Sequence, residues 1–340
     1  MSVRPRELMA LLEANILTRE PALVVSSPGL GKTDMVGQIA KKLDADLIMS
    51  HPSTEDPTDP KGMPWCWNEK GVIKADFIPF GQIEKLIKAD RLTVWFIDDL
   101  GQAAWSVQAP YMQWFGSRRV NGHILNDNVA IIAATNRKSD KAASNGIIEP
   151  LKGRSVIYDL TDDIDDWCMW AYQNNILPDI IACLRANSSI LCDFKPTSEL
   201  TNSPTPRTWH KLSNLMSSGK IPDHLEMEVA KGYVGEAAAT HYLGFRRIGK
   251  SLSGKNSPDY IILHPDDGGI PDSLDALYVI CGTLARKASE NTMGRLVTYA
   301  NRLPAEFSVY LIKDAVSFCK DTVNTKAYVE WLSAHADVVV

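Results

Sequence analysis

The sequence predicts an α/β fold, in which helices cover a parallel sheet, followed by a mainly helical region. Short apolar segments rich in β-branched residues alternate with amphipathic helical segments over residues 1–160, which is the pattern of a parallel sheet. Beyond residue 160, the strand signals fade and helical periodicity dominates. The 340 residues are enough for about two domains with sizeable cores.

Regular alternation defines the elements expected in the first region. The expected helices cover residues 6–17, 33–43, 81–90 and 103–114. The expected strands cover residues 23–25, 45–49, 92–97 and 129–134, and a small hairpin is expected at 118–128. The order of these elements is the reason for expecting a sheet covered by helices.

An insertion over residues 51–82 interrupts this alternation. Its first part favours turns, and residues 65–73 predict a hairpin that turns at 69–71, so we expect the insertion to project from the domain. Its aromatic side chains either face a partner or a pore, or pack as a local core under the hairpin. The local core is the favoured interpretation for any single tryptophan. These aromatic residues are Trp65, Trp67, Phe77 and Phe80.

The sequence divides into three regions. Residues 1–160 form the α/β core, residues 161–250 are expected to be helical, and residues 258–340 form a last helical region. Residues 198–206, which contain several prolines, indicate a linker within the second region. Residues 249–256 form a polar break before the third.

Composition and charge argue against several classes of function. The formal net charge is −5, so a nucleic-acid partner is disfavoured, although a local basic patch is not excluded. No apolar segment approaches the ~20 residues that a membrane helix needs. The N-terminus lacks the apolar stretch and cleavage site of a signal peptide, so we expect a cytoplasmic protein with no membrane partner.

Cysteines and histidines give no sign of a metal site. The six cysteines form no C-x-x-C pair, and the seven histidines form no cluster with metal-ligand spacing. We therefore expect free thiols, buried or half-buried, in a reducing compartment.

Residues 26–33, Ser-Ser-Pro-Gly-Leu-Gly-Lys-Thr, form a glycine-rich loop between an expected strand and an expected helix. This context predicts a phosphate-binding loop, because backbone N–H groups and the helix N-terminus converge on phosphate oxygens. Lys32 would reach the β- and γ-phosphates, and the Thr33 hydroxyl would bind Mg²⁺. Ser26 replaces the usual first glycine, which a small residue can do where no positive φ is needed. The residues expected to bind nucleotide are Pro28, Gly29, Leu30, Gly31, Lys32 and Thr33.

Two carboxylates follow the expected strand at 92–97. Asp98 and Asp99 lie at the edge of the sheet where ligands of open α/β folds bind. We expect Asp98 to hold Mg²⁺ through water and Asp99 to polarise the attacking water. Two aspartates after a strand also fit a loop that begins with a helix cap. The preceding phosphate loop is what favours the catalytic interpretation.

Asn136 lies at the equivalent end of the next expected strand, 129–134. Its amide can both donate and accept hydrogen bonds. This property suits a group that aligns a water molecule on the γ-phosphate, so Asn136 is a candidate catalytic residue.

Together, the Ser-Ser-Pro-Gly-Leu-Gly-Lys-Thr, Ile-Asp-Asp and Ala-Thr-Asn-Arg segments resemble the AAA+ ATPases, and among them the MoxR-type branch of phages and prophages. The resemblance covers residues 1 to about 245. It implies an AAA+ core that uses ATP and Mg²⁺, followed by a helical lid at 161–250. It also implies that residues 51–80 are the helix-2 insertion facing a ring pore, and that 118–128 are the hairpin before the sensor-1 strand. Residues 258–340 carry no motif of the family.

Two arginines extend the resemblance. Arg154 lies where the family has an arginine finger that enters the neighbouring subunit's site. Arg207 matches the sensor-2 position, which opens a lid helix and contacts the γ-phosphate within one subunit. Both roles need a permanent cation with several donors. Lys152 and Arg137 are nearby alternatives for the finger. Arg154 and Arg207 could each be only a surface charge.

The resemblance therefore implies an ATP-hydrolysing homo-oligomeric ring, expected to be a hexamer, because a finger supplied in trans completes the site at a subunit boundary. Motion between core and lid would remodel or chaperone a protein client, such as a von Willebrand factor A-domain protein. The family usually has glutamate at the position of Asp99, so a weakly hydrolysing ATP-binding switch or scaffold is one alternative. A DNA-directed motor is another, and the acidic balance disfavours it.

Overall fold

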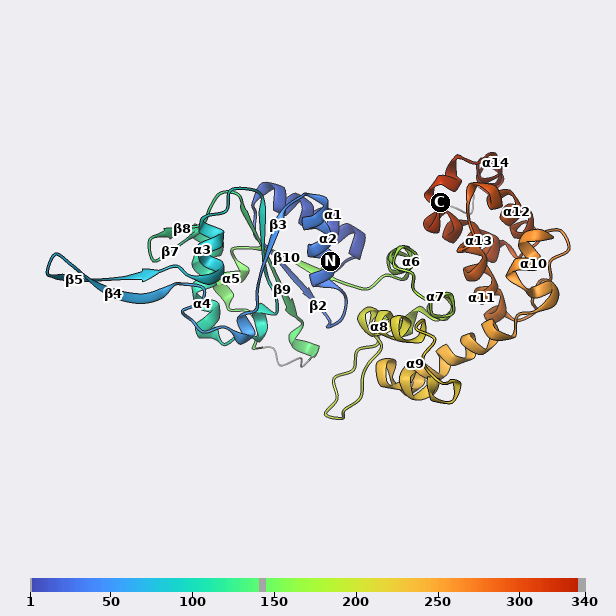
Figure 1. The fold of residues 1–340 in the computed structure, drawn as a ribbon, viewed down its shortest axis with the longest axis horizontal. Coiled ribbons are helices and arrows are strands. Elements are labelled where there is room, and N and C mark those ends of the chain that lie inside the picture. Colours follow the sequence, from blue (N-terminus) through green and yellow to red (C-terminus); the bar gives the residue numbers. More distant parts are fainter. Residues whose placement is uncertain (1, 141–144, 336–340) are drawn as a thin grey trace. The chain divides into compact units, whose positions relative to one another are not determined.

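The computed structural model describes residues 2–140 and 145–335, and the chain forms two compact units. The first comprises Met1–Asp162 with Phe194–Pro196, and the second comprises Asp163–Asp193 and Thr197–Val340. The first unit contains a parallel sheet with flanking helices, and the described part of the second is helical (Figure 1). The predicted fold class, an α/β core followed by a helical region, is confirmed.

Six strands form the main sheet in the order β1-β10-β2-β9-β6-β3, with all neighbours parallel. They are β1 (Ser2–Val3), β10 (Val156–Leu160), β2 (Ala22–Ser26), β9 (Val129–Asn136), β6 (Thr93–Ile97) and β3 (Asp46–Ser50). Every residue of β6 and β9 is buried, as expected for apolar strands covered on both faces. The register of β2 on β9 pairs Ser26 with Asn136. The start of the glycine-rich loop therefore lies beside Asn136.

The sequence does not predict β1 or β10. β1 has two residues, too few for any periodic signal. β10 begins with exposed side chains, Val156 and Ile157, and includes a tyrosine and an aspartate, so it lacks the continuous apolar pattern of the buried strands. Pairing with β2 and β1, which are distant in sequence, makes this segment a strand.

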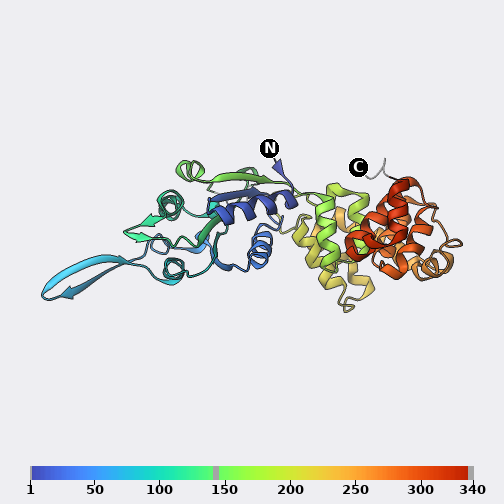
Figure 2. The same cartoon turned by 90° about the horizontal axis from the view of Figure 1, so that it is seen from above.

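Helices cover both faces of the sheet (Figures 1 and 2). They are α1 (Pro5–Thr18), α2 (Lys32–Lys42), α3 (Gly81–Ile87), α4 (Trp105–Ser117) and α5 (Glu149–Lys152). α1 and α2 contact each other, and they contact β9 and β6 respectively. The other three helices share a core with sheet residues such as Leu23, Trp95 and Ile131. The strand ends and the loop after β2 are thus held by a packed framework.

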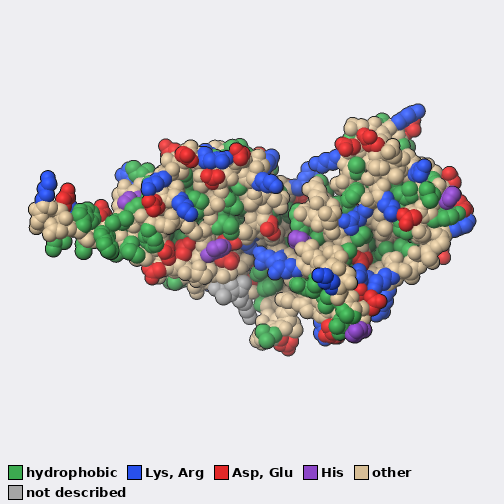
Figure 3. Space-filling model, in the orientation of Figure 1, with side chains coloured by type: hydrophobic (Ala, Val, Ile, Leu, Met, Phe, Trp, Pro, Cys, Tyr) green, Lys and Arg blue, Asp and Glu red, His purple; other side chains and the backbone are tan. Residues whose placement is uncertain are grey.

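The insertion forms a hairpin that extends away from the rest of the first unit in both views (Figures 1 and 2). Its strands, β4 (Met63–Glu69) and β5 (Val72–Ile78), are longer than the predicted hairpin. Trp65 is 57% exposed and Ile73 is 78% exposed. The favoured interpretation of a local core is therefore wrong for the tryptophans, because no described residue of the first unit covers the ribbon that carries them. Figure 3 shows hydrophobic side chains gathered along this hairpin.

The second unit contains two hydrophobic clusters in its described residues. Its helices are α6 (Ile164–Gln173), α7 (Pro178–Ala186), α8 (Pro206–Met216), α9 (Glu226–Ser251), α10 (Pro258–Leu263), α11 (Leu274–Ala285), α12 (Glu290–Ala300), α13 (Ala305–Phe318) and α14 (Lys326–Ala334). α6 to α9 surround one cluster, and α10 to α14 surround the other. α11 joins them, because Val279 belongs to the first and Ile280 to the second. Residues 336–340 of the expected C-terminal region lie outside the described residues.

A buried ion network also connects these two parts of the second unit. Arg185 on α7 donates to Asp314 on α13 at 2.8 Å and also pairs with Asp165 on α6. The Tyr172 hydroxyl donates to the other oxygen of Asp314 at 2.5 Å. Burial raises the pKa of the Asp314 carboxyl, whereas Arg185 and Tyr172 act in the opposite direction. The network stabilises the packing of α13 only while the Asp314 carboxylate and the Arg185 guanidinium are both present.

Arg185→Ala is therefore expected to destabilise the second unit by about 3–5 kcal/mol, because it leaves a buried carboxylate without its cation. The Asp314 side chain is 1% exposed, so bulk water solvates it poorly and does not offset the lost partner in full. The matched control is Lys255→Ala, which removes an exposed ion pair with Asp267 and should cost about 0–1 kcal/mol. Urea unfolding of both variants measures the difference, and equal losses would contradict the structural role of the network.

The described helices include none that is long and apolar enough to cross a membrane. All six cysteines are free thiols. Cys168, Cys183 and Cys281 are buried, and burial raises the pKa of each thiol. Cys66 lies exposed on the projecting hairpin, so the expectation of buried or half-buried cysteines is wrong at this position.

Candidate phosphate-binding site

The glycine-rich loop connects the end of β2 to the start of α2. Gly29 and Gly31 have φ values of 82° and 86°, in the left-handed region that favours glycine. Ser26 belongs to β2 and is not among the residues with positive φ, which explains how serine replaces the usual first glycine. Gly31 directly precedes α2, so the first backbone N–H groups of this helix face the end of the loop.

Lys32 reaches across the ends of two adjacent strands. Its Nζ donates to the Ser26 hydroxyl and to Oδ1 of Asn136, each at 2.9 Å. The residue is only 8% exposed. Because β2 and β9 pair Ser26 with Asn136, the two acceptors lie side by side and hold the ammonium group at the sheet edge.

Thr33 connects the loop to the acidic end of β6. Its hydroxyl donates to Oδ2 of Asp98 at 2.8 Å. A hydroxyl and a carboxylate are hard oxygen ligands of the kind that Mg²⁺ prefers. The donor set therefore fits the metal that the sequence predicts for Thr33 and Asp98.

Asp99 adopts a left-handed conformation with φ of 54°. Its Oδ1 accepts a hydrogen bond from Nδ2 of Asn136 at 3.3 Å, and its N–H donates to Oδ1 of Asp98 at 3.0 Å. Asn136 therefore bridges Lys32 and Asp99. The structure brings together Lys32, Thr33, Asp98, Asp99 and Asn136, the side chains that the sequence predicts for the core of the site.

The basic candidates lie in different surroundings. Arg137 donates to Asp159 and to the Ser27 hydroxyl of the loop. Lys152 pairs with Glu149 at 2.7 Å. Arg137, which directly follows β9, thus supports the loop, and the sequence alone does not predict this role. Its position directly after Asn136 is the only sequence signal for that role.

Arg154 and Arg207 belong to different units. Arg154 follows α5 in the first unit and donates from Nη1 to the Pro150 carbonyl at 2.6 Å. Arg207 lies in the first turn of α8 in the second unit, directly after the N-cap Thr205. The sensor role of Arg207 stays a prediction.

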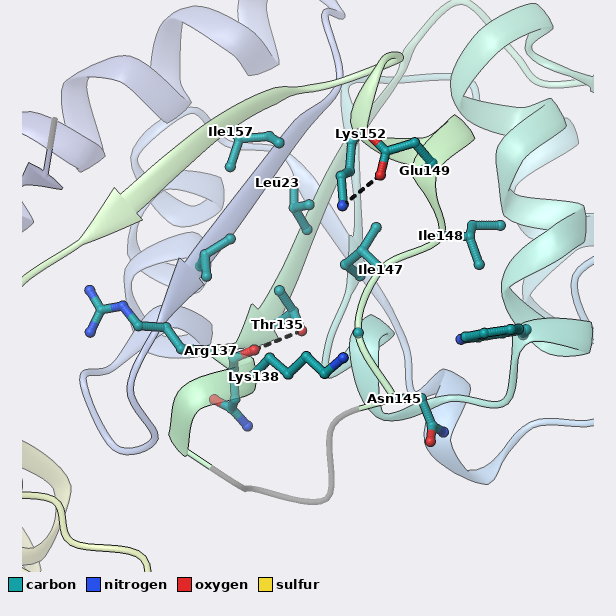
Figure 4. Close-up of a pocket in the computed structure, with 14 residues that line it drawn as sticks. Leu23, Thr135, Arg137, Lys138, Asn145, Ile147, Ile148, Glu149, Lys152 and Ile157 are labelled. Atoms are coloured by element: carbon teal, nitrogen blue, oxygen red, sulfur yellow. Dashed lines mark hydrogen bonds and ion pairs between the residues drawn. The ribbon is translucent and has the colours of Figure 1, made fainter.

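A pocket of about 510 Å³ lies between the sheet and the segment that leads into α5 (Figure 4). Leu23, Ile147, Ile148 and Ile157 give it an apolar lining, and Asn136 also lines it. In Figure 4, the side chains of Lys138 and Arg137 point in opposite directions from the end of β9. The apolar lining distinguishes this pocket from the polar cluster around Lys32.

The fold is an α/β parallel sheet, and its strand, glycine-rich loop and helix match the P-loop pattern, in which backbone N–H groups hold nucleotide phosphates. No protein-family model and no curated protein matches the chain. It is similar to the solved structure of the Thermotoga maritima RuvB Holliday junction branch migration motor, with 15% identity, a TM-score of 0.41, and coverage of 97% of this chain and 86% of that chain. It is also similar to NtrX from Brucella abortus, with 14% identity, a TM-score of 0.42, and coverage of 98% and 67%. Similarity at this level assigns no family and no activity to the chain.

Proposed function

We propose that this protein is a Mg²⁺-dependent ATP phosphohydrolase of the AAA+ class and of the MoxR type. The observation that carries the proposal is the pair of contacts from the loop, Lys32 to Asn136 and Thr33 to Asp98. They gather a cation, metal-binding oxygens and an amide at the carboxyl edge of one sheet. Positioned groups of these kinds are what phosphoryl transfer requires.

The loop residues have distinct tasks when ATP binds. The backbone of residues 28–31 and the N-terminus of α2 hold the phosphates, and Lys32 neutralises charge on the β- and γ-phosphates. Mg²⁺, bound by Thr33 and by Asp98 through water, would supply further positive charge there. When a phosphate oxygen takes the place of Asn136 at Lys32, Oδ1 of Asn136 becomes available to accept a hydrogen bond from the attacking water.

Asp99 is the proposed group that polarises this water. The hydrogen bond from Asn136 orients its carboxylate at the site, although aspartate is one methylene shorter than the glutamate usual in the family. The shorter side chain favours a second candidate function, an ATP-binding switch or scaffold that hydrolyses slowly. Steady-state turnover distinguishes the two, because a switch binds ATP with the same loop but releases little phosphate.

Arg154 is the proposed trans arginine of a homo-oligomeric ring, which we infer to be a hexamer. Its two alternatives already pair with carboxylates of the same subunit, Arg137 with Asp159 and Lys152 with Glu149. The described contact of Arg154 is with a backbone carbonyl, which leaves its charge available to a phosphate.

Client binding and location complete the proposal. Arg207 would contact the γ-phosphate, and the nucleotide-dependent motion of the lid would remodel or chaperone a protein client, such as a von Willebrand factor A-domain protein. The exposed tryptophans of the hairpin, Trp65 and Trp67, support a surface for protein contact. The six free thiols support a reducing, cytoplasmic setting.

Asp98→Asn tests the proposed function. We expect Mg²⁺-dependent ATP turnover to fall about 100-fold or more, because the amide lacks the charge that holds the metal, whereas nucleotide affinity changes less. Phosphate release and equilibrium nucleotide binding, measured on the same preparation, check both parts. The control, Asp267→Asn, changes an exposed carboxylate paired with Lys255 and should turn over like the parent protein. Parental turnover by Asp98→Asn would exclude these carboxylates from the reaction.

A further inference from the structure

The side chain of Arg154 lies directly over Gly116 of α4. A Cβ atom at position 116 would be 2.6 Å from Nε and 2.9 Å from Cδ of Arg154, closer than such atoms can approach. The Pro150 carbonyl, on α5, accepts the hydrogen bond from Nη1. The missing side chain at Gly116 and the carbonyl of Pro150 together define the course of the arginine.

The backbone gives no reason for glycine at this position. Gly116 lies within α4 and is not among the glycines with positive φ. The left-handed residue that ends the helix is Arg118, with φ of 53°. Glycine inside a helix costs about 1 kcal/mol relative to alanine. With Arg154 in this position, no side chain fits at residue 116. Because the contact is with the far end of an exposed side chain, the glycine determines the position of the arginine and not the fold.

We propose that Gly116 is a positioning residue. The space left by its missing side chain, beside the Pro150 carbonyl, forms the seat that places Arg154 for its action on the neighbouring subunit. This inference rests on the proposed function, in which Arg154 is the trans arginine. A guanidinium has five N–H donors, and the described contacts of Arg154 use one nitrogen, Nη1. The seat restricts a long side chain that is otherwise costly to order, and it leaves the other donors for phosphate oxygens.

Gly116→Ala is expected to displace the arginine without disturbing the fold. Arg154 and Gly116 are both exposed, so the side chain can move into solvent, and alanine favours the helix. Misplacement by about 1 Å can reduce a rate about 100-fold, so we expect turnover to fall between about 10-fold and 100-fold. ATP affinity and the unfolding temperature should not decrease. The matched control is Gly244→Ala, an exposed helical glycine of α9 whose Cβ would meet open space.

Mixing subunits shows whether Gly116→Ala acts by misplacing Arg154 or by harming the active site of its own subunit. Subunits with Gly116→Ala keep an intact loop, and subunits with Lys32→Ala keep a seated arginine. In mixed assemblies, turnover per intact loop should rise above that of Gly116→Ala alone, because the neighbour supplies the arginine. A variant that harms its own active site would show no rise, and this result would overturn the proposal.

Arg154→Ala, measured in parallel, tells apart failure of this inference and failure of the proposed function. Full turnover by Arg154→Ala would contradict the role of this arginine itself, and the seat would have no function. Loss of turnover by Arg154→Ala together with parental turnover by Gly116→Ala would overturn only the seat. Loss in both, with recovery on mixing, is the expected result.

Discussion

Lys32→Ala should reduce the affinity for ATP by about 100-fold or more. Hydrogen bonds to charged groups contribute about 1.5–3 kcal/mol each, and the lysine ammonium is expected to make two with the β- and γ-phosphates. In the structure its Nζ is held at the sheet edge by Ser26 and Asn136, both within 2.9 Å, so the cation is already close to the loop. Removing it deletes the charge without altering the glycine backbone.

A matched control for this variant lies on the same helix. Lys41 is an exposed lysine in the last turn of α2, so Lys41→Ala changes the net charge equally but not the loop. Calorimetric titration with ATP measures both affinities, and the ATP-dependent rise in unfolding temperature provides a second readout, because a ligand that binds the native state stabilises it. Parental affinity in a folded Lys32→Ala protein would contradict the loop assignment.

Local signals explain why the framework of the site is predictable. The strands that carry Asp98 and Asn136 are continuous apolar runs, and Gly29 and Gly31 mark the loop, so each piece is visible within a few residues. Parallel strands end at a common edge, which is why side chains from different strands are expected to meet. The hydrogen bond from Asn136, at the end of β9, to Asp99, which follows β6, is such a contact.

Features that depend on pairing between distant segments are not predictable in this way. β10 is a strand because it pairs with β2, and Arg137 can donate to Asp159 only once that pairing has formed. The seat of Arg154 depends on how α5 packs near the end of α4, which no periodicity encodes. The predicted local core under the hairpin is wrong for a different reason. Its tryptophans are typical core residues, but a ribbon without a covering layer leaves them exposed.

Arg154→Ala should abolish hydrolysis while leaving ATP binding intact. An arginine finger acts on charge that develops in the transition state, so it contributes about 10³-fold or more to turnover and much less to ground-state affinity. The loop of the same subunit, including Lys32 and Thr33, is unchanged in this variant. Calorimetric titration should therefore give parental affinity, while phosphate release should be lost. A parallel loss of affinity would indicate that the arginine acts on its own loop.

Mixing Arg154→Ala subunits with Lys32→Ala subunits tests whether the arginine acts in trans. Each variant alone is expected to be inactive, because Arg154→Ala lacks the finger and Lys32→Ala lacks the lysine of the loop. In mixed rings, some interfaces join an intact loop to an intact finger, so turnover should reappear. Recovery follows from geometry alone, because neither subunit regains the group that it lacks.

Absence of recovery has two causes that the mixing ratio separates. If Arg154 acts in cis or is structural, mixed rings contain no complete site, and parental subunits doped with either variant lose activity only in proportion to the dose. If instead all subunits must hydrolyse ATP together, a single inactive subunit abolishes the activity of its ring. Doping then suppresses the parental activity more steeply than in proportion to the dose. Co-assembly is established independently by tagging one variant and capturing the other. Proportional loss without recovery in co-assembled rings would contradict a trans role for Arg154, whereas recovery at intermediate ratios requires that the finger of one subunit completes the site of the next.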